Sequence, residues 1–280
     1  MKGRVICIIS QRYTVLFEDN TREVCVAMGK LRKTMSPVVG DFVEVVKYDD
    51  VYGIEKIYDR TNYLVRPLVA NVDQAVIVMS CKDPDFSTTL IDRLIFLISE
   101  ANITPKIVVT KLDLLDDTTE IMGYIEDYRN SGYEVVLKSD EEALDNLFKG
   151  RISVLTGQSG AGKSSLLNVL DPTLELRTQE ISKALGRGKH TTRHVELLPM
   201  KGGYIADTPG FSSLDFEHFS RSSLSNSVPD FEPYIGMCKF NDCVHEHEPG
   251  CAVKAAVDAK KISAIRYGHY LECLKLCKGK

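Results

Sequence analysis

The residues best suited to chemistry lie in the middle of the chain, in the string GQSGAGKS at residues 157–164. The string fits the pattern G-x-x-x-x-G-K-[ST], follows the strand-like run RISVLT and opens the helical stretch KSSLLNVL. In this setting backbone N–H groups curl around phosphates, and the helix N-terminus favours their charge. We expect Lys163 to bridge the β- and γ-phosphates of a nucleotide and Ser164 to bind Mg²⁺. The expected nucleotide contacts are Gly157, Gln158, Ser159, Gly160, Ala161, Gly162, Lys163, Ser164 and Ser165.

A second string that bears on phosphate chemistry is DTPG at residues 207–210, directly after the short strand-like run KGGYIA. In nucleotidases with this kind of phosphate loop, an Asp at a strand end holds Mg²⁺. We assign that role to Asp207, and we expect the backbone N–H of Gly210 to contact the γ-phosphate. The stretch GRGKHTTRHVEL between the two strings is interpreted as a switch loop. In it, Thr191 or Thr192 reaches Mg²⁺ and the γ-phosphate.

The string TKLD at residues 110–113 indicates which base the nucleotide carries. A carboxylate after a strand accepts hydrogen bonds from both N1–H and the N2 amino group of guanine, a pair that adenine does not offer. Asp113 is the expected acceptor, Lys111 lays its stem along the ring, and Leu112 lies between them. The usual motif begins with Asn, and the hydroxyl of Thr110 replaces only part of an amide's bonding. We therefore expect guanine specificity with modest affinity.

The order of these strings is unusual for a GTPase. Ordinary GTPases place the phosphate loop first, then the Mg²⁺ Asp and then the guanine motif, whereas here the guanine motif comes first. A circularly permuted sheet forms the same pocket, because the termini of compact domains often lie close together. Phe211 stands where Ras-like enzymes place a water-orienting Gln, and an apolar side chain cannot align a nucleophile. The isolated enzyme is therefore expected to be slow.

A cluster of sulfur and imidazole ligands lies near the C-terminus. Cys238, Cys243, His245 and Cys251 fall within 14 residues, with His247 as a spare candidate. Three thiolates and one imidazole suit a closed tetrahedral zinc site, which has a structural role because no position is left for water. We expect one structural zinc ion, which would stabilise a domain whose own core is small.

Composition places the chain among globular proteins. It has 280 residues, of which 44% are hydrophobic and 26% charged, with a net charge of −4. No stretch approaches the roughly 18 apolar residues of a membrane helix, and the N-terminus does not fit a signal peptide, so we expect a cytoplasmic protein. The other five cysteines lie in apolar or helical runs and are expected in the core: Cys7, Cys25, Cys81, Cys273 and Cys277.

The pattern of elements divides the chain into three segments. Residues 1–66 contain five short strand-like runs, as in a small closed barrel of the OB or SH3 kind. Residues 67–218 alternate strands and helices, which predicts an α/β domain with a parallel sheet covered on both sides. Residues 219–280 hold the metal cluster and end in a helix from about Ala252. The middle segment is acidic and both ends are mildly basic, so the ends are the expected contacts if RNA is bound.

Together the barrel, the order TKLD, GQSGAGKSS and DTPG, and the string CKFNDCVHEHEPGCAV resemble the RsgA family of small-subunit-dependent GTPases. The resemblance implies an OB-fold RNA-binding domain (1–66), a circularly permuted P-loop GTPase domain (67–218) and a mainly helical zinc domain (219–280). It implies a monomer that binds GTP and GDP and hydrolyses GTP on the 30S subunit, with stimulation by that subunit during late maturation. Both flanking domains would touch 16S rRNA.

The resemblance also assigns roles residue by residue. Thr192 matches the switch threonine, so the implied Mg²⁺ set is Ser164, Thr192 and Asp207. His190 is a candidate to replace the missing water-orienting group. Two other classes of function stay open: a nucleotide-gated RNA or protein clamp in which hydrolysis is incidental, and an ATP-using P-loop protein, against which Asp113 argues.

Overall fold

The structure is a computed structural model that describes residues 1–29, 31, 35–65, 68–173, 196–206 and 216–278. Its contacts divide the chain into two compact units, and each is described by itself. The first unit comprises Met1–Ala75, Asp140–Thr156 and Lys163–Gly210. The second unit comprises Val76–Ser139, Gly157–Gly162 and Phe211–Lys280.

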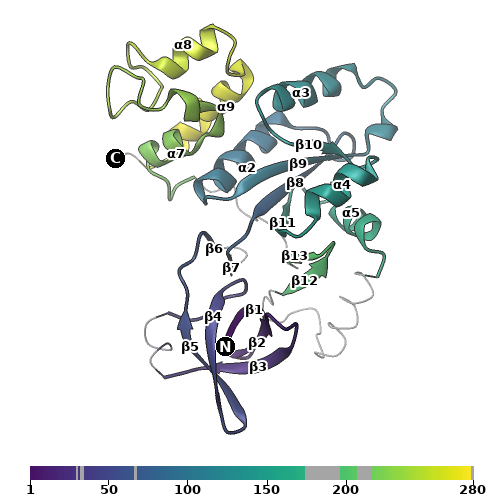
Figure 1. Ribbon diagram of the computed structural model, residues 1–280. Coiled ribbons are helices and arrows are strands. Elements are labelled where there is room, and N and C mark those ends of the chain that lie inside the picture. The colour runs from purple at the N-terminus through teal and green to yellow at the C-terminus, as the bar shows by residue number, and fades with distance from the viewer. Residues whose placement is uncertain (30, 32–34, 66–67, 174–195, 207–215, 279–280) are drawn as a thin grey trace. The chain divides into compact units, whose positions relative to one another are not determined.

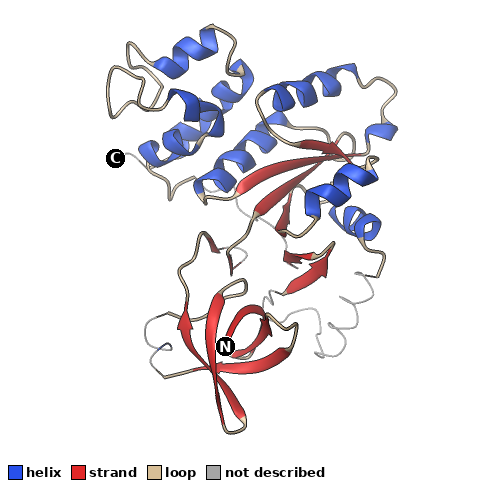
Figure 2. Cartoon of the chain, in the orientation of Figure 1, coloured by secondary structure: helices blue, strands red, loops and turns tan. Residues whose placement is uncertain are grey.

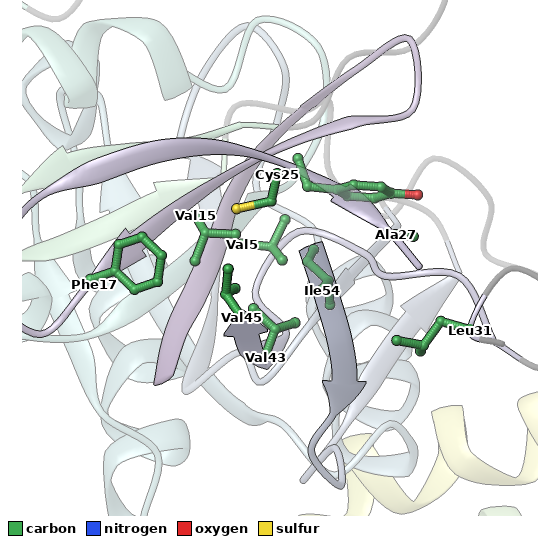
Figure 3. Close-up of a cluster of buried hydrophobic side chains, with 10 residues drawn as sticks. Val5, Val15, Phe17, Cys25, Ala27, Leu31, Val43, Val45 and Ile54 are labelled. Carbon is green, nitrogen blue, oxygen red and sulfur yellow. The ribbon is translucent and has the colours of Figure 1, made fainter. Parts of the chain in front are cut away.

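The N-terminal strands close into a barrel of order β1-β2-β3-β5-β4, in which β3 and β5 pair in parallel (Figure 1). The five strands agree with the five runs expected from the sequence: β1 Lys2–Ile9, β2 Arg12–Phe17, β3 Arg22–Ala27, β4 Phe42–Tyr48 and β5 Val51–Ile57. Alternate side chains along each strand point inward and form one apolar core, part of which is shown in Figure 3. Val5, Val15, Cys25 and Ile54 are fully buried there, so Cys25 is a core residue as predicted.

The strands of the middle segment form a six-stranded sheet of order β10-β9-β8-β11-β13-β12 (Figure 2). Their bounds are β8 Gln74–Ser80, β9 Thr104–Thr110, β10 Val135–Leu137, β11 Ile152–Thr156, β12 Leu197–Met200 and β13 Gly203–Ala206. Every residue of β8 is buried, as expected of a strand covered on both faces. A separate two-stranded sheet consists of β6 Tyr63–Val65 and β7 Leu68–Ala70.

The prediction of a wholly parallel sheet is wrong at one edge. The pairs β9–β10 and β11–β13 are parallel, but β12 runs antiparallel to β13. The physical reason is the connection, because β12 and β13 are joined by only Lys201 and Gly202, both at positive φ. A two-residue turn of this kind makes a hairpin, whereas a parallel neighbour needs a long crossover.

Helices follow the strands of this segment in alternation. They are α2 Thr88–Glu100, α3 Thr119–Asn130, α4 Glu141–Phe148 and α5 Lys163–Leu170, with a short 3₁₀ helix, η1 Leu112–Leu114. Helix α4 was not expected from the sequence, although Asp140 caps it by accepting a hydrogen bond from the N–H of Ala143. Within the described ranges, no helix has the length and apolar character that a bilayer span requires.

The C-terminal segment is mainly helical, as predicted. Its elements are α7 Arg221–Ser227, η2 Pro229–Tyr234, α8 Ala252–Asp258 and α9 Ala264–Leu276. The expected helix from about Ala252 is two helices, because residues 259–263 separate α8 from α9. Cys273 and Cys277 on α9 are buried, as their spacing predicted, and Cys7 and Cys81 are buried as well.

A buried arginine ties α9 to the helices of the second unit. The side chain of Arg266 is 2% exposed and meets three carboxylates and the faces of two tyrosine rings. The carboxylates are Asp230 at 2.5 Å, Asp127 at 3.0 Å and Asp92 at 3.3 Å, and the rings are Tyr128 and Tyr133 at 4.6 and 5.0 Å. These interactions fix the metal-binding segment against α2 and α3.

Candidate nucleotide site and metal centre

The phosphate loop lies between β11 and the first residue of α5, as the sequence predicted. Gly157 has a φ of +126°, and a Cβ on it would lie 2.1 Å from the carbonyl oxygen of Val78. Such a contact excludes every other residue type here, because the loop backbone runs directly against strand β8. Only glycine fits here, as the tight approach of a phosphate-binding loop requires.

Thr110 links the guanine motif to the phosphate loop. Its hydroxyl donates a 2.7 Å hydrogen bond to the carbonyl oxygen of Ala161, and the side chain is buried, with 1% exposed. A longer contact of 3.5 Å joins the same hydroxyl to the carbonyl of Met79. The threonine that replaces the usual asparagine thus holds together two segments 51 residues apart in the chain.

Lys111 lies in the left-handed region, with a φ of 58°, at the turn into η1. Its ammonium donates to the carbonyl of Asp83, in the loop that follows β8. In the same pair of loops, Lys82 donates to the carbonyl of Leu114 at 3.3 Å. Two lysine contacts therefore join the guanine motif to the neighbouring loop and fix the direction of the Lys111 stem.

A cavity of about 530 Å³ opens beside the guanine motif. It is lined by Val109, Lys111, Leu112, Asp113, Thr118, Leu137, Lys138 and Ser139. Lys111, Leu112 and Asp113 were predicted as base contacts, but Lys138 and Ser139 were not. They follow strand β10, which pairs in parallel with β9, so their place beside the TKLD turn follows from the rule that carboxyl ends of parallel strands share one edge.

The remaining catalytic candidates are described only in part. Lys163 is the first residue of α5, where burial lowers the pKa of its ammonium, and Ser164 follows it with an exposed side chain. His190, Thr191, Thr192, Asp207, Gly210 and Phe211 lie outside the described residues. The roles of these six residues stay predictions.

The four predicted zinc ligands converge on one point. Their ligand atoms all lie within 4.8 Å of one another in Cys238, Cys243, His245 and Cys251. Nδ1 of His245 lies 3.6, 3.4 and 3.4 Å from the sulfurs of Cys238, Cys243 and Cys251, and the first and last sulfurs are 3.9 Å apart. A tetrahedral zinc ion requires about 3.5 Å between nitrogen and sulfur and about 3.8 Å between sulfurs, given its ordinary bond lengths. The donor set fits zinc in type and in spacing.

The surroundings of this cluster orient the ligands. The ring of Phe231 meets that of His245 edge to face at 5.4 Å, and the hydroxyl of Tyr267 donates to the His245 carbonyl at 2.7 Å. Burial lowers the pKa of His245, which favours the neutral imidazole, and raises that of the Cys243 thiol to about 12, so this thiol would lose its proton when it binds a metal. The spare candidate, His247, is 88% exposed in its side chain and lies outside the ligand set.

Comparison with known proteins decides the family. The family model for the RsgA GTPase matches residues 57–217, which is more than half of the chain. The chain belongs to the RsgA GTPase family. The resemblance inferred from the sequence motifs is thereby confirmed, and with it the chemistry of the pocket, which is the hydrolysis of GTP.

Relatives and solved structures cover nearly the whole chain. "Small ribosomal subunit biogenesis GTPase RsgA 2" of Oceanobacillus iheyensis is 48% identical, with 98% of this chain and 96% of that protein aligned. The RsgA of Bacillus subtilis is 47% identical, with 97% and 95% aligned. A crystal structure of YloQ, described as a circularly permuted GTPase, has a TM-score of 0.81 at 39% identity and covers 98% of this chain and 93% of that one. YjeQ from Thermotoga maritima has a TM-score of 0.82 at 32% identity, with 98% and 97% covered.

These likenesses extend to the fold. YloQ is described as a circularly permuted GTPase, and this chain, which has the same fold, places the guanine motif before the phosphate loop. The predicted fold class is therefore confirmed: a circularly permuted P-loop GTPase with an OB-like barrel before it and a Cys₃His cluster, compatible with zinc, after it.

Proposed function

We propose that this GTPase binds the 30S ribosomal subunit during late maturation and that the subunit stimulates its hydrolysis of GTP. The bond from Thr110 to Ala161, which joins the TKLD turn to the phosphate loop, supports the GTP-binding part of the proposal. The relatives aligned over nearly the full chain are named small ribosomal subunit biogenesis GTPases, which supports the same partner for this chain. Its place of action is then the cytoplasm, where ribosomal subunits mature.

Each part of the site has a distinct task in this proposal. Asp113 accepts from guanine, the N–H groups of the loop from Gly157 onward bind the phosphates, and Lys163 neutralises the β- and γ-phosphates. The Cβ contact that excludes other residues at position 157 supports this use of the loop. Mg²⁺, bound with GTP, neutralises the charge that develops on the phosphates. We propose Ser164, Thr192 and Asp207 as its protein ligands, and Gly210 as a backbone contact to the γ-phosphate.

The isolated enzyme lacks the usual side chain that orients the attacking water. Phe211 follows the Mg²⁺ motif and has no polar atom with which to orient a water molecule. His190, next to the switch threonines, is the proposed substitute. We propose that the 30S subunit helps to position the attacking water and so accelerates hydrolysis.

The flanking segments supply the contacts with the subunit. We propose domains at 1–66, 67–218 and 219–280, with the first and last touching 16S rRNA as a monomer binds. Within residues 2–58, the described side chains make five contacts between a cation and an aromatic ring, and a sixth joins Arg60 to Tyr63. Cations and rings together are typical of surfaces that bind single-stranded nucleic acid.

The test is GTP turnover titrated with purified 30S subunits, with 50S subunits as the control. The proposal predicts slow turnover alone, a rise that saturates with 30S, and no comparable rise with 50S. Lys163→Ala should abolish both the slow and the stimulated turnover. Equal turnover with and without 30S subunits would contradict the ribosome-dependent mechanism and leave the GTPase activity alone standing.

A further inference from the structure

The outer face of the barrel carries an ordered grid of side chains across three strands. Register places Lys2 of β1 opposite Glu44 of β4, and Glu44 opposite Lys56 of β5. All three side chains are exposed. They form one row, because residues paired across neighbouring strands point to the same face.

A second row lies beside the first on the same face. Arg4 of β1 pairs with Phe42 of β4, two residues from the Lys2–Glu44 pair, so both rows face outward. The N–H of Tyr58 donates to the carbonyl of Phe42 at 2.9 Å and continues this row at the end of β5. The second row therefore holds one cation and two rings, each half-buried.

The cations of this grid lie over its rings. The guanidinium of Arg4 is 4.2 Å from the centre of the Phe42 ring, and the ammonium of Lys2 is 5.4 Å from the same ring. Tyr58 receives Lys2 at 5.3 Å and Lys56 at 4.9 Å. Contact with the rings holds three flexible side chains close together, which reduces the entropy lost when they bind an anion.

Charge on this face favours a polyanion. Lys2, Arg4 and Lys56 face a single carboxylate in the grid, Glu44, and Asp73 acts on Arg4 from beside it. The ligand face of OB folds in general is formed by strands 2 and 3. In this barrel the described outward positions of β2 and β3 hold no aromatic ring, and Tyr13 and Phe17 are buried in the core. The outward residues are Arg12, Thr14, Leu16, Arg22, Val24 and Val26. Rings and cations thus coincide on the β1–β4–β5 face.

We propose that this face, defined by Lys2, Arg4, Phe42, Lys56 and Tyr58 and here named the β1–β4–β5 face, binds the phosphate backbone of single-stranded RNA. The lysines and Arg4 neutralise phosphates, and the rings pack against the sugars and bases between them. The contact carries no base specificity, because phosphates present the same oxygens in every sequence. The inference rests on the proposed function, since it names the surface through which the barrel reaches RNA.

The experiment measures binding of a fluorescent oligo(U) strand of about 12 nucleotides, a length within the site sizes of OB folds, to the full chain at several KCl concentrations. Lys2→Glu with Lys56→Glu is expected to weaken binding by about tenfold or more. It should also flatten the plot of log K against log salt by about 1.4, because each lost single-strand phosphate contact removes about 0.7.

The matched control is Arg12→Glu with Arg22→Glu, which changes the net charge equally on the outer face of β2 and β3. It should leave the salt slope close to that of the wild type, and turnover without ribosomes should be unchanged in both double variants. The proposal is overturned if the two double variants lose affinity equally, or if the wild type does not bind the oligonucleotide. Normal RNA binding by the Lys2/Lys56 variant together with poor 30S binding would point to a ribosomal protein and also overturn it.

The 30S titration of the wild type, run in parallel, separates this inference from the proposed function. Stimulation of the wild type with unaltered RNA binding by the Lys2/Lys56 variant refutes only the assignment of the β1–β4–β5 face. Absence of stimulation in the wild type refutes the proposed function whatever the RNA measurement gives.

Discussion

Thr110 illustrates how one side chain can serve the nucleotide site without facing the nucleotide. An asparagine at this position has two polar groups, whereas threonine has one hydroxyl, and here that hydroxyl is committed to the Ala161 carbonyl. Asp113 and the residues that line the same cavity are therefore the proposed contacts for the base.

Thr110→Val should weaken binding of GTP and GDP to a similar extent, by about 1–2 kcal/mol. The change keeps the shape of the side chain and leaves the buried Ala161 carbonyl without its donor, so the phosphate loop is held less firmly. Calorimetric titration of both nucleotides measures the effect. Thr110→Ser keeps the hydroxyl and should bind nearly as the wild type does. Equal losses in the valine and serine variants would show that the hydroxyl is not the cause.

Asp113→Asn should shift the base preference from guanine towards xanthine. It removes the charged acceptor for guanine and leaves a guanine donor unpaired, which should cost roughly 1–3 kcal/mol of GTP affinity. The affinity for xanthosine triphosphate should increase, because its carbonyl oxygen at C2 accepts a hydrogen bond from the new amide. Competition binding with both nucleotides measures the ratio of their affinities. Unchanged GTP affinity would mean that TKLD does not read the base.

Residue types in the site were largely predictable, but their partners were not. The phosphate loop, the TKLD turn and the Cys₃His set could be recognised because each is a local pattern of residue types. The partner of Thr110 lies 51 residues away, at a carbonyl that carries no side-chain signal. Lys138 and Ser139 were missed because they match no motif, and only the parallel pairing of β9 with β10 brings them to the cavity.

At the scale of elements, periodicity predicted the long segments and failed at the short ones. Strand β8 and helix α2 have continuous or periodic apolar patterns, and both were expected from the sequence. Helix α4 is eight residues long and edge strand β12 is four, too short for a period to be recognised. The antiparallel direction of β12 follows from the two-residue turn Lys201-Gly202, with both residues at positive φ, and this turn was not recognised in the sequence.

Cys243→Ala should remove zinc from the C-terminal segment. The remaining three ligands no longer close a tetrahedron, and the folding free energy supplied by the metal is lost. Metal analysis should give about one zinc per chain in the wild type and far less in the variant. Cys277→Ala, which alters a buried cysteine outside the cluster, should keep its zinc. Equal zinc content in Cys243→Ala and the wild type would refute the ligand assignment.

Arg266→Leu should destabilise the second unit strongly. Removing the cation takes the guanidinium from the buried carboxylates Asp92 and Asp230, 1% and 3% exposed, at a cost of about 3–5 kcal/mol. Asp92 keeps its contact with His269 at 2.6 Å, so the larger part of the loss is expected at Asp230. Urea unfolding measures this change. Arg129→Leu removes a surface ion pair with Glu126 and should cost under about 1 kcal/mol. A similar decrease in the free energy of unfolding in both variants would show that the Arg266 network is not an important source of stability.

At the scale of the whole molecule, the GTPase motifs lie in the middle of the chain and the proposed contacts with RNA lie in its two end segments. The permuted order places the barrel before the guanine motif and the metal centre after the Mg²⁺ motif, so both ends of the GTPase fold carry an added segment. The acidic middle segment and the mildly basic ends suit a protein whose flanks approach RNA. Because Phe211 has no polar atom to orient a water molecule, we propose that hydrolysis depends on what these flanks bind.

The most direct test of the account is single-turnover cleavage of GTP bound to the protein, with and without saturating 30S subunits. Single-turnover conditions isolate the chemical step from product release. Stimulation of about 10³–10⁵ is the scale when a partner supplies a catalytic group, and ordering of the chain's own residues should give less. The account predicts a cleavage rate that rises by at least about tenfold with 30S and falls back as added salt weakens the contacts. An identical rate with and without 30S would contradict it and favour a nucleotide-gated clamp in which hydrolysis is incidental.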